Sequence, residues 1–171
     1  MVMVEERARK IKLLILDVDG VLTDGGIIYS NFGDEAKCFN VQDGFGMTLL
    51  FRSGIKSVII TARRTAVVKK RARDMRVMRV YSDHRKLDVY EKVLRKFRVK
   101  DEEVCFIGDD LIDLPVIKRV GFAAAPPDAS EDVKRFAHYV TRKEGGKGAV
   151  REVIEIILKA QGKWEGILAK Y

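Results

Sequence analysis

Carboxylates gather at a few points along the chain, each directly after an apolar run. The polar residues that follow the runs 11–16, 55–60 and 104–107 are Asp17, Asp19, Asp24, Thr61, Arg63, Asp109, Asp110 and Asp113. Like charges this close together are costly unless something compensates them. Oxygen ligands without His or Cys suit a hard cation such as Mg²⁺, which also binds phosphate oxygens.

A simpler interpretation is that each Asp caps a helix or a turn. That interpretation suffices for Asp24 or Asp113 taken alone. It explains poorly why acidic groups recur directly after separate apolar runs.

The elements that must position these residues follow from the hydrophobic pattern. We predict strands at residues 11–16, 55–60, 78–81, 104–107, 120–124 and 138–141. We predict helices at about 43–53, 64–74, 85–97, 111–118, 129–136 and 147–160. This alternation predicts an α/β fold: a three-layer, doubly wound, mostly parallel sheet. Ligands bind at the carboxyl ends of the strands in such sheets, so the acidic segments should converge there.

A β-hairpin is expected at about 26–41, where extended stretches flank the turn signal Asn31–Asp34. With 171 residues, 47% of them hydrophobic, the chain is predicted to be a single domain spanning 1–171. Its C-terminal helix and tail are placed at about 145–171.

No apolar run reaches the roughly 20 residues of a membrane span, and the first residues do not resemble a secretory signal. We therefore expect a cytoplasmic protein with no membrane partner, in which Cys38 and Cys105 are reduced thiols.

The net charge of +8 raises the question of an anionic partner. The densest basic run, residues 69–73, follows Val67 and Val68 at helical spacing, which favours a solvated helix face. Because no aromatic residue interleaves with this run, we expect no nucleic-acid partner.

Two segments resemble the haloacid dehalogenase superfamily. LDVDGVLTD, at 16–24, is similar to its first motif, and GDDLID, at 108–113, to its fourth. Thr61 is similar to the second motif, and Lys86 is the best match to the third, with Arg85 as the alternative.

This resemblance implies the catalytic roles. Asp17 would attack phosphorus and form an aspartyl-phosphate, and Asp19 would act as acid and then base. Thr61 and Lys86 would contact the phosphoryl group.

The resemblance also implies the metal ligands. Asp17, the backbone carbonyl of Asp19, and Asp109 would bind Mg²⁺. Asp110 and Asp113 would orient waters bound to the metal.

The motif spacing leaves no room for an inserted cap domain. Asp17 and Thr61 are 44 positions apart, and Thr61 and Lys86 are 25 apart. Both intervals are filled by the elements predicted above, so the fold is expected to be capless.

The chain resembles the 3-deoxy-D-manno-octulosonate 8-phosphate phosphatase family along nearly all its length. The matching segments are DGGIIYSNFGDEAKCFNVQDG, GDDLIDLPVIKRVG and YVTRKEGGKGAVREVIEIILKAQGKWE. The resemblance implies a homo-oligomer, a tetramer assembled by the hairpin, with a neighbouring subunit helping to close the site. It also implies that the tail near Gly145–Gly148 can fold over the site. The alternative is that the apolar hairpin packs on its own domain.

The resemblance gives three candidate substrate contacts. Arg63 is the best candidate for a sugar carboxylate, whereas Asp43 and Gly44 either contact the substrate or cap the next helix. The family usually has Arg at the position of Gln42 and Gly at that of Ala62.

The function expected from this resemblance is Mg²⁺-dependent removal of phosphate from 3-deoxy-D-manno-octulosonate 8-phosphate, in lipopolysaccharide precursor synthesis. One alternative is a phosphatase for nonulosonate 9-phosphates. Less favoured are a nucleic-acid 3′-phosphatase and a non-catalytic tetramerisation module. Intact Asp17, Asp19, Thr61 and Asp109 disfavour the last of these.

Overall fold

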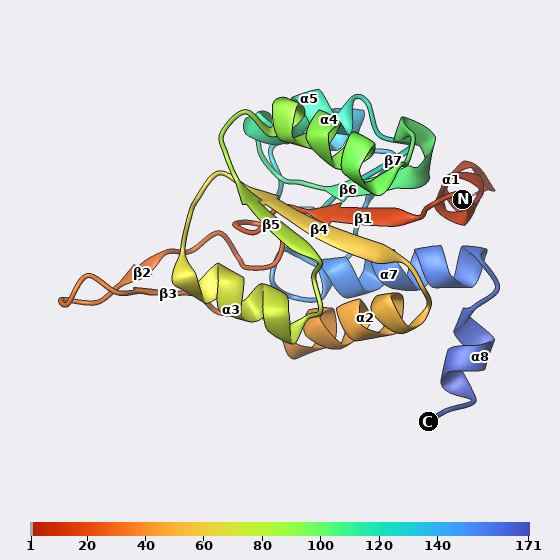
Figure 1. Ribbon diagram of the computed structural model, residues 1–171, viewed down its shortest axis with the longest axis horizontal. Helices are drawn as coiled ribbons and strands as arrows, with labels where there is room; N and C mark the ends of the chain where they lie inside the picture. The colour runs from red at the N-terminus through yellow and green to blue at the C-terminus, as the bar shows by residue number, and fades with distance from the viewer. Residues whose placement is uncertain (1) are drawn as a thin grey trace.

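A six-stranded parallel sheet forms the centre of the computed structural model, which describes residues 2–171 (Figure 1). Across the sheet the strands are β5 (Arg79–Ser82), β4 (Lys56–Thr61), β1 (Leu13–Leu16), β6 (Val104–Ile107), β7 (Phe122–Ala125) and β8 (Tyr139–Val140). Every neighbouring pair is parallel. The predicted doubly wound α/β fold is confirmed, with strand ends within about two residues of the predicted ones.

Helices cover both faces of the sheet and complete the three layers (Figure 1). One face packs against α1 (Val2–Arg9), α2 (Val41–Arg52), α3 (Ala66–Asp74) and α7 (Ala149–Ala160). The other packs against α4 (Lys86–Phe97), α5 (Leu114–Ile117) and α6 (Glu131–Phe136). Two 3₁₀ turns, Asp101–Glu103 and Leu111–Asp113, and the short helix α8 (Trp164–Leu168) complete the structure.

Strand β1 shows why the apolar runs are continuous rather than alternating. Leu13 and Ile15 belong to the core beneath α4, while Leu14 and Leu16 belong to the core beneath α2 and α7. All four side chains are fully buried because helices cover both faces. Cys105, on β6, is buried in the same way.

Helix α2 begins two residues before its predicted start, because Asn40 caps it. The Asn40 side chain accepts a hydrogen bond from the backbone N–H of Gln42 at 2.7 Å. Helices α1 and α8 were not predicted. The first is highly charged and the second has only 5 residues, so neither gives a strong apolar period.

The hairpin consists of β2 (Ile28–Tyr29) and β3 (Glu35–Ala36), which are shorter than predicted and extend away from the sheet (Figure 1). Its tip is exposed: Tyr29 is 65% and Phe32 is 94% accessible. Phe39, by contrast, packs against the core and lies beneath Arg71.

Helix α3 carries the basic run. Lys69, Lys70 and Arg73 are exposed, as a solvated helix face requires, whereas Arg71 is half-buried over Phe39. Among residues 2–171, none of the helices has the length and apolarity needed to cross a bilayer.

Candidate active site

The three predicted strand ends meet at the carboxyl edge of the sheet. Asp17 follows β1, Thr61 ends β4, and Asp109 lies just after β6. Together they line a hollow of about 280 Å³. Its lining residues are Asp17, Asp19, Gly25, Thr61, Ala62, Arg63, Lys86, Asp109, Asp110 and Ile112.

Lys86 links two of the carboxylates in the buried floor of the hollow. It is the first residue of α4 and is only 2% accessible. Its Nζ lies 2.9 Å from Asp17 Oδ2 and 2.6 Å from Asp113 Oδ1. Arg85, the alternative cation, is exposed and pairs with Asp83 and Asp88 at the surface. Of the two, it is therefore Lys86 that enters the site.

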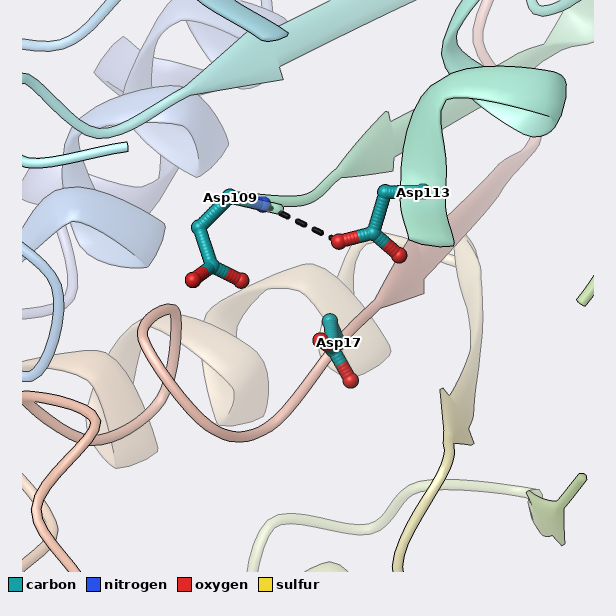
Figure 2. A group of neighbouring side chains, drawn as sticks. All are labelled: Asp17, Asp109 and Asp113. Atoms are coloured by element: carbon teal, nitrogen blue, oxygen red, sulfur yellow. Dashed lines mark hydrogen bonds between the residues drawn. The ribbon is translucent and has the colours of Figure 1, made fainter. Parts of the chain in front are cut away.

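Asp113 holds the loop that carries Asp109. Its Oδ2 accepts the backbone N–H of Asp109 at 3.0 Å (Figure 2). The same oxygen accepts the backbone N–H of Asp110 at 3.4 Å. Since its Oδ1 accepts from Lys86, both of its oxygens are engaged within the protein. The Asp110 side chain caps the following 3₁₀ turn through the N–H of Leu111.

Negative charge is concentrated at this site beyond what Lys86 can balance. Carboxylate oxygens of Asp17, Asp109 and Asp113 all lie within 4.8 Å of one another (Figure 2). Burial, and then the charge of Asp113, raises the pKa of Asp17 to about 7. Burial, and then the charges of Asp17 and Asp113, raises the pKa of Asp109 to about 8.

These groups fit a divalent cation. Asp109 Oδ1 is buried and has no hydrogen-bond partner among residues 2–171. An orphaned oxygen beside crowded carboxylates is what a bound cation would satisfy. Asp109 therefore has a free oxygen for it, and Lys86 engages only one oxygen of Asp17, whereas both oxygens of Asp113 are engaged.

Glycines let two loops approach this cluster closely. Gly20 has φ +82°, and a Cβ there would collide with the Asp109 carboxylate. Gly145 is packed so closely on the Gly20 carbonyl that it too must lack a side chain. The adjacent Gly146 donates its N–H to Val21 O at 3.0 Å. The glycine-rich tail therefore lies on the loop that carries Asp17.

The hairpin reaches the rim of the hollow. The ammonium of Lys37 pairs with Asp19 Oδ1 and, at 2.8 Å, with Glu35 Oε1. Glu35 Oε2 in turn pairs with Arg63 Nη2 at 2.8 Å, and Arg63 also donates to the hydroxyl of Tyr29.

Known proteins match the chain over most of its length. The model of the haloacid dehalogenase-like hydrolase family matches residues 67–154. The 3-deoxy-D-manno-octulosonate 8-phosphate phosphatase of Yersinia pestis is 47% identical over 162 residues, which cover 94% of this chain and 87% of that protein. The enzyme of that name from Escherichia coli K12 is 45% identical over 158 residues, covering 92% and 84%. The chain belongs to the haloacid dehalogenase-like hydrolases.

The chain is also similar to solved structures of 3-deoxy-D-manno-octulosonate 8-phosphate phosphatases. The crystal structure of the Yersinia pestis phosphatase superposes with a TM-score of 0.94 and covers 96% of this chain and 89% of that one. The phosphatase of Moraxella catarrhalis, solved with magnesium ion, phosphate ion and KDO, is 40% identical with a TM-score of 0.98. That match covers 99% of this chain and 98% of the other.

Two candidate substrate contacts do not line the hollow of this haloacid dehalogenase-like hydrolase. Asp43 is buried, and its Oδ1 accepts the backbone N–H of Arg151 at 2.8 Å, so it caps the start of α7. Gly44 faces the guanidinium of Arg71 instead. The histidines are also outside the hollow: His84 is exposed, and His138 Nδ1 accepts the N–H of Ala123.

Sequence reasoning missed Lys37 and Glu35. The available signal was the alternation in β3 and the residues after it, where polar Glu35 and Lys37 share one face. That pattern alone does not say that this face turns back toward Asp19.

Removing the Lys86 ammonium should destabilise the fold. We expect Lys86→Met to lower the free energy of unfolding by about 3 kcal/mol without metal, because Asp17 and Asp113 lose their shared cation while buried. Urea unfolding of Lys86→Met and of the exposed control Lys92→Met would measure the difference. Equal stability of the two variants would show that Lys86 does not hold this site together.

Proposed function

We propose that this chain is a Mg²⁺-dependent phosphatase that hydrolyses 3-deoxy-D-manno-octulosonate 8-phosphate, a step in lipopolysaccharide precursor synthesis. The observation that carries the proposal is the 47% identity to a phosphatase of that name across 94% of this chain. The relative that holds magnesium, phosphate and KDO together supports the cofactor and the substrate class.

Asp17 is the proposed nucleophile. One of its carboxylate oxygens would attack phosphorus, and the bond from phosphorus to the sugar oxygen would break, leaving an aspartyl-phosphate. Lys86, 2.9 Å from Asp17 Oδ2, would hold this carboxylate in place and pair with the phosphoryl oxygens. The Thr61 hydroxyl, at the end of β4, would donate to one of those oxygens.

Asp19 is the proposed acid and base. It would give a proton to the departing sugar oxygen and then take one from the water that attacks the aspartyl-phosphate. Phosphate leaves and Asp17 is regenerated. Asp19 borders the hollow and is part-exposed, so it has access to both substrate and water.

Asp17, Asp109 and the backbone carbonyl of Asp19 would hold Mg²⁺, which supplies positive charge to the transferring phosphoryl group when bound. Asp113 would hold the Asp109 loop in place by accepting hydrogen bonds from the N–H groups of Asp109 and Asp110. Asp110 lies at the rim, where it would orient water on the metal.

Arg63 is the proposed contact for the sugar carboxylate, since a guanidinium binds carboxylates through strong charge-assisted hydrogen bonds. Its Nε has no hydrogen-bond partner among residues 2–171. Asp43 and Gly44 would serve the site indirectly, by fixing the start of α7 and the packing of Arg71.

We further propose a cytoplasmic homo-oligomer, a tetramer, in which the exposed hairpin tip is covered by neighbouring subunits. The apolar exposure of Ile28, Tyr29 and Phe32 supports this, because such residues are costly to leave in water. The molar mass in solution, measured by light scattering, tests it; a monomer would contradict it.

A substrate panel tests the function. We expect kcat/KM for the eight-carbon sugar-acid phosphate to exceed that for nine-carbon sugar-acid phosphates, simple phosphosugars and 3′-phosphorylated DNA. Released phosphate is the measurement. Preference for a nine-carbon sugar-acid phosphate would show that the enzyme is a nonulosonate 9-phosphate phosphatase. Preference for DNA would overturn the proposal.

A further inference from the structure

We infer that Lys37 is a positioning residue for Asp19. Through Lys37 and Glu35, the hairpin thus helps to hold the side chains of the site in place. The inference rests on the proposed acid–base role of Asp19. It concerns residues that do not belong to the nucleophile and metal cluster.

The first observation is burial. The Lys37 side chain is 0% accessible, although it lies beside β3 on a hairpin whose tip is exposed. A buried ammonium is costly unless it is paired. Lys37 is paired on both sides, with Asp19 and with Glu35, so the hairpin is anchored to the loop after β1 through this one side chain.

The second observation is which Asp19 oxygen is used. Lys37 engages Oδ1, whereas Oδ2 lies 3.9 Å from Arg63 Nε. Lys37 therefore fixes the carboxyl by one oxygen and leaves the other for proton transfer. A catalytic acid must be held within hydrogen-bond reach of the atom it protonates.

The third observation is that Glu35 connects Lys37 to Arg63. Glu35 Oε1 lies 2.8 Å from Lys37 Nζ, and Glu35 Oε2 lies 2.8 Å from Arg63 Nη2. Among residues 2–171, the other cation that pairs with Asp19 is Arg63, and it would remain in the absence of Lys37. The acid would then turn toward the residue proposed to bind the sugar carboxylate, and both functions would suffer.

Leaving-group dependence tests this inference. An aryl phosphate such as 4-nitrophenyl phosphate releases a stable anion that needs little protonation, whereas a sugar alkoxide needs an acid. We expect Lys37→Met to lower kcat/KM for the sugar phosphate about 10²-fold, the lower range for loss of acid catalysis. We expect a loss of less than about tenfold for the aryl phosphate. Lys37→Arg should restore most of the activity, and the exposed control Lys92→Met should match the wild type.

Equal losses on the two substrates, or no loss, would overturn the inference, because a residue that merely supports the fold affects both alike. An Asp19→Asn background gives a second measurement: there Lys37→Met should cost little more, since the residue that it positions is already lost. Full additivity would also overturn the inference. If the wild type fails to hydrolyse the sugar phosphate, the proposed function fails, and this inference falls with it.

Discussion

Asp17→Asn is expected to lower kcat for the sugar-acid phosphate by at least about 10⁴-fold, as loss of a covalent nucleophile does. The amide oxygen is a poor nucleophile, and we expect neither neighbouring carboxylate, Asp109 or Asp113, to take its place. The oxygens of Asp113 are engaged by Lys86 and by two backbone N–H groups. Asp109 belongs to the proposed Mg²⁺ site instead. Steady-state phosphate release is the measurement.

The same variant should remain folded. The raised pKa of Asp17, caused first by burial, means that its charged form is disfavoured in the folded state. An uncharged Asn should therefore leave the melting temperature unchanged or higher at pH 8 without metal. Asp74→Asn, at the exposed end of α3, is the matched control. Activity within tenfold of the wild type would rule out Asp17 as the nucleophile.

The fold was predictable because its strands are buried on both faces. The runs at β1 and β6 contain only apolar residues, and an Asp or a Gly–Asp pair follows each one. Once the strands are placed, parallel order brings Asp17, Thr61 and Asp109 to one edge. The position of these three residues is thus a consequence of topology, which sequence periodicity reports well.

What the sequence could not reveal depends on side-chain direction over long separations. Lys37 reaches Asp19 only because the hairpin folds back along the loop after β1. Asp43 is near the start of α2 in sequence, yet it caps α7, whose first turn lies more than a hundred residues later. Neither contact has a local signature, because both depend on how separate elements pack.

The tail is an intermediate case. Its glycines were visible in the sequence, but the reason for them was not. Gly145 and Gly146 lie against the backbone of Gly20 and Thr23, where a Cβ would collide with main-chain atoms. The contact is backbone on backbone, so no side-chain pattern could have identified its partner.

Removal of Mg²⁺ should abolish turnover and change how stability depends on pH. Asp17 and Asp109 have pKa values of about 7 and about 8 in the fold, above the usual value near 3.9 in an unfolded chain. The folded protein therefore holds more protons than the unfolded one between about pH 4 and 8. Stability of the metal-free protein should fall as pH rises through that window.

Added Mg²⁺ should reverse this trend, because it takes the place of the protons. At 100 times its Kd a ligand stabilises the folded state by about 2.7 kcal/mol. For a chain of this size that corresponds to a rise in Tm of roughly 5–10 °C. We expect that rise at pH 8 and a much smaller one at pH 5, where protons already occupy the carboxylates. Thermal unfolding with and without excess chelator measures it, alongside phosphate release.

Asp109→Asn separates a cation site from a merely acidic cluster. It removes one charge from the cluster of Asp17, Asp109 and Asp113, in which Lys86 pairs only with the other two, so the metal-free variant should be more stable than the wild type at pH 8. Its Mg²⁺-dependent rise in Tm should nevertheless disappear, together with turnover. Damage to the fold would lower stability in both conditions, and a site without metal would show no Mg²⁺ effect in either protein. Asp109→Asn should be more stable than the wild type without Mg²⁺ and less stable than the wild type with it. We expect this reversal only if Asp109 is crowded by its neighbours and binds the cation that relieves the crowding.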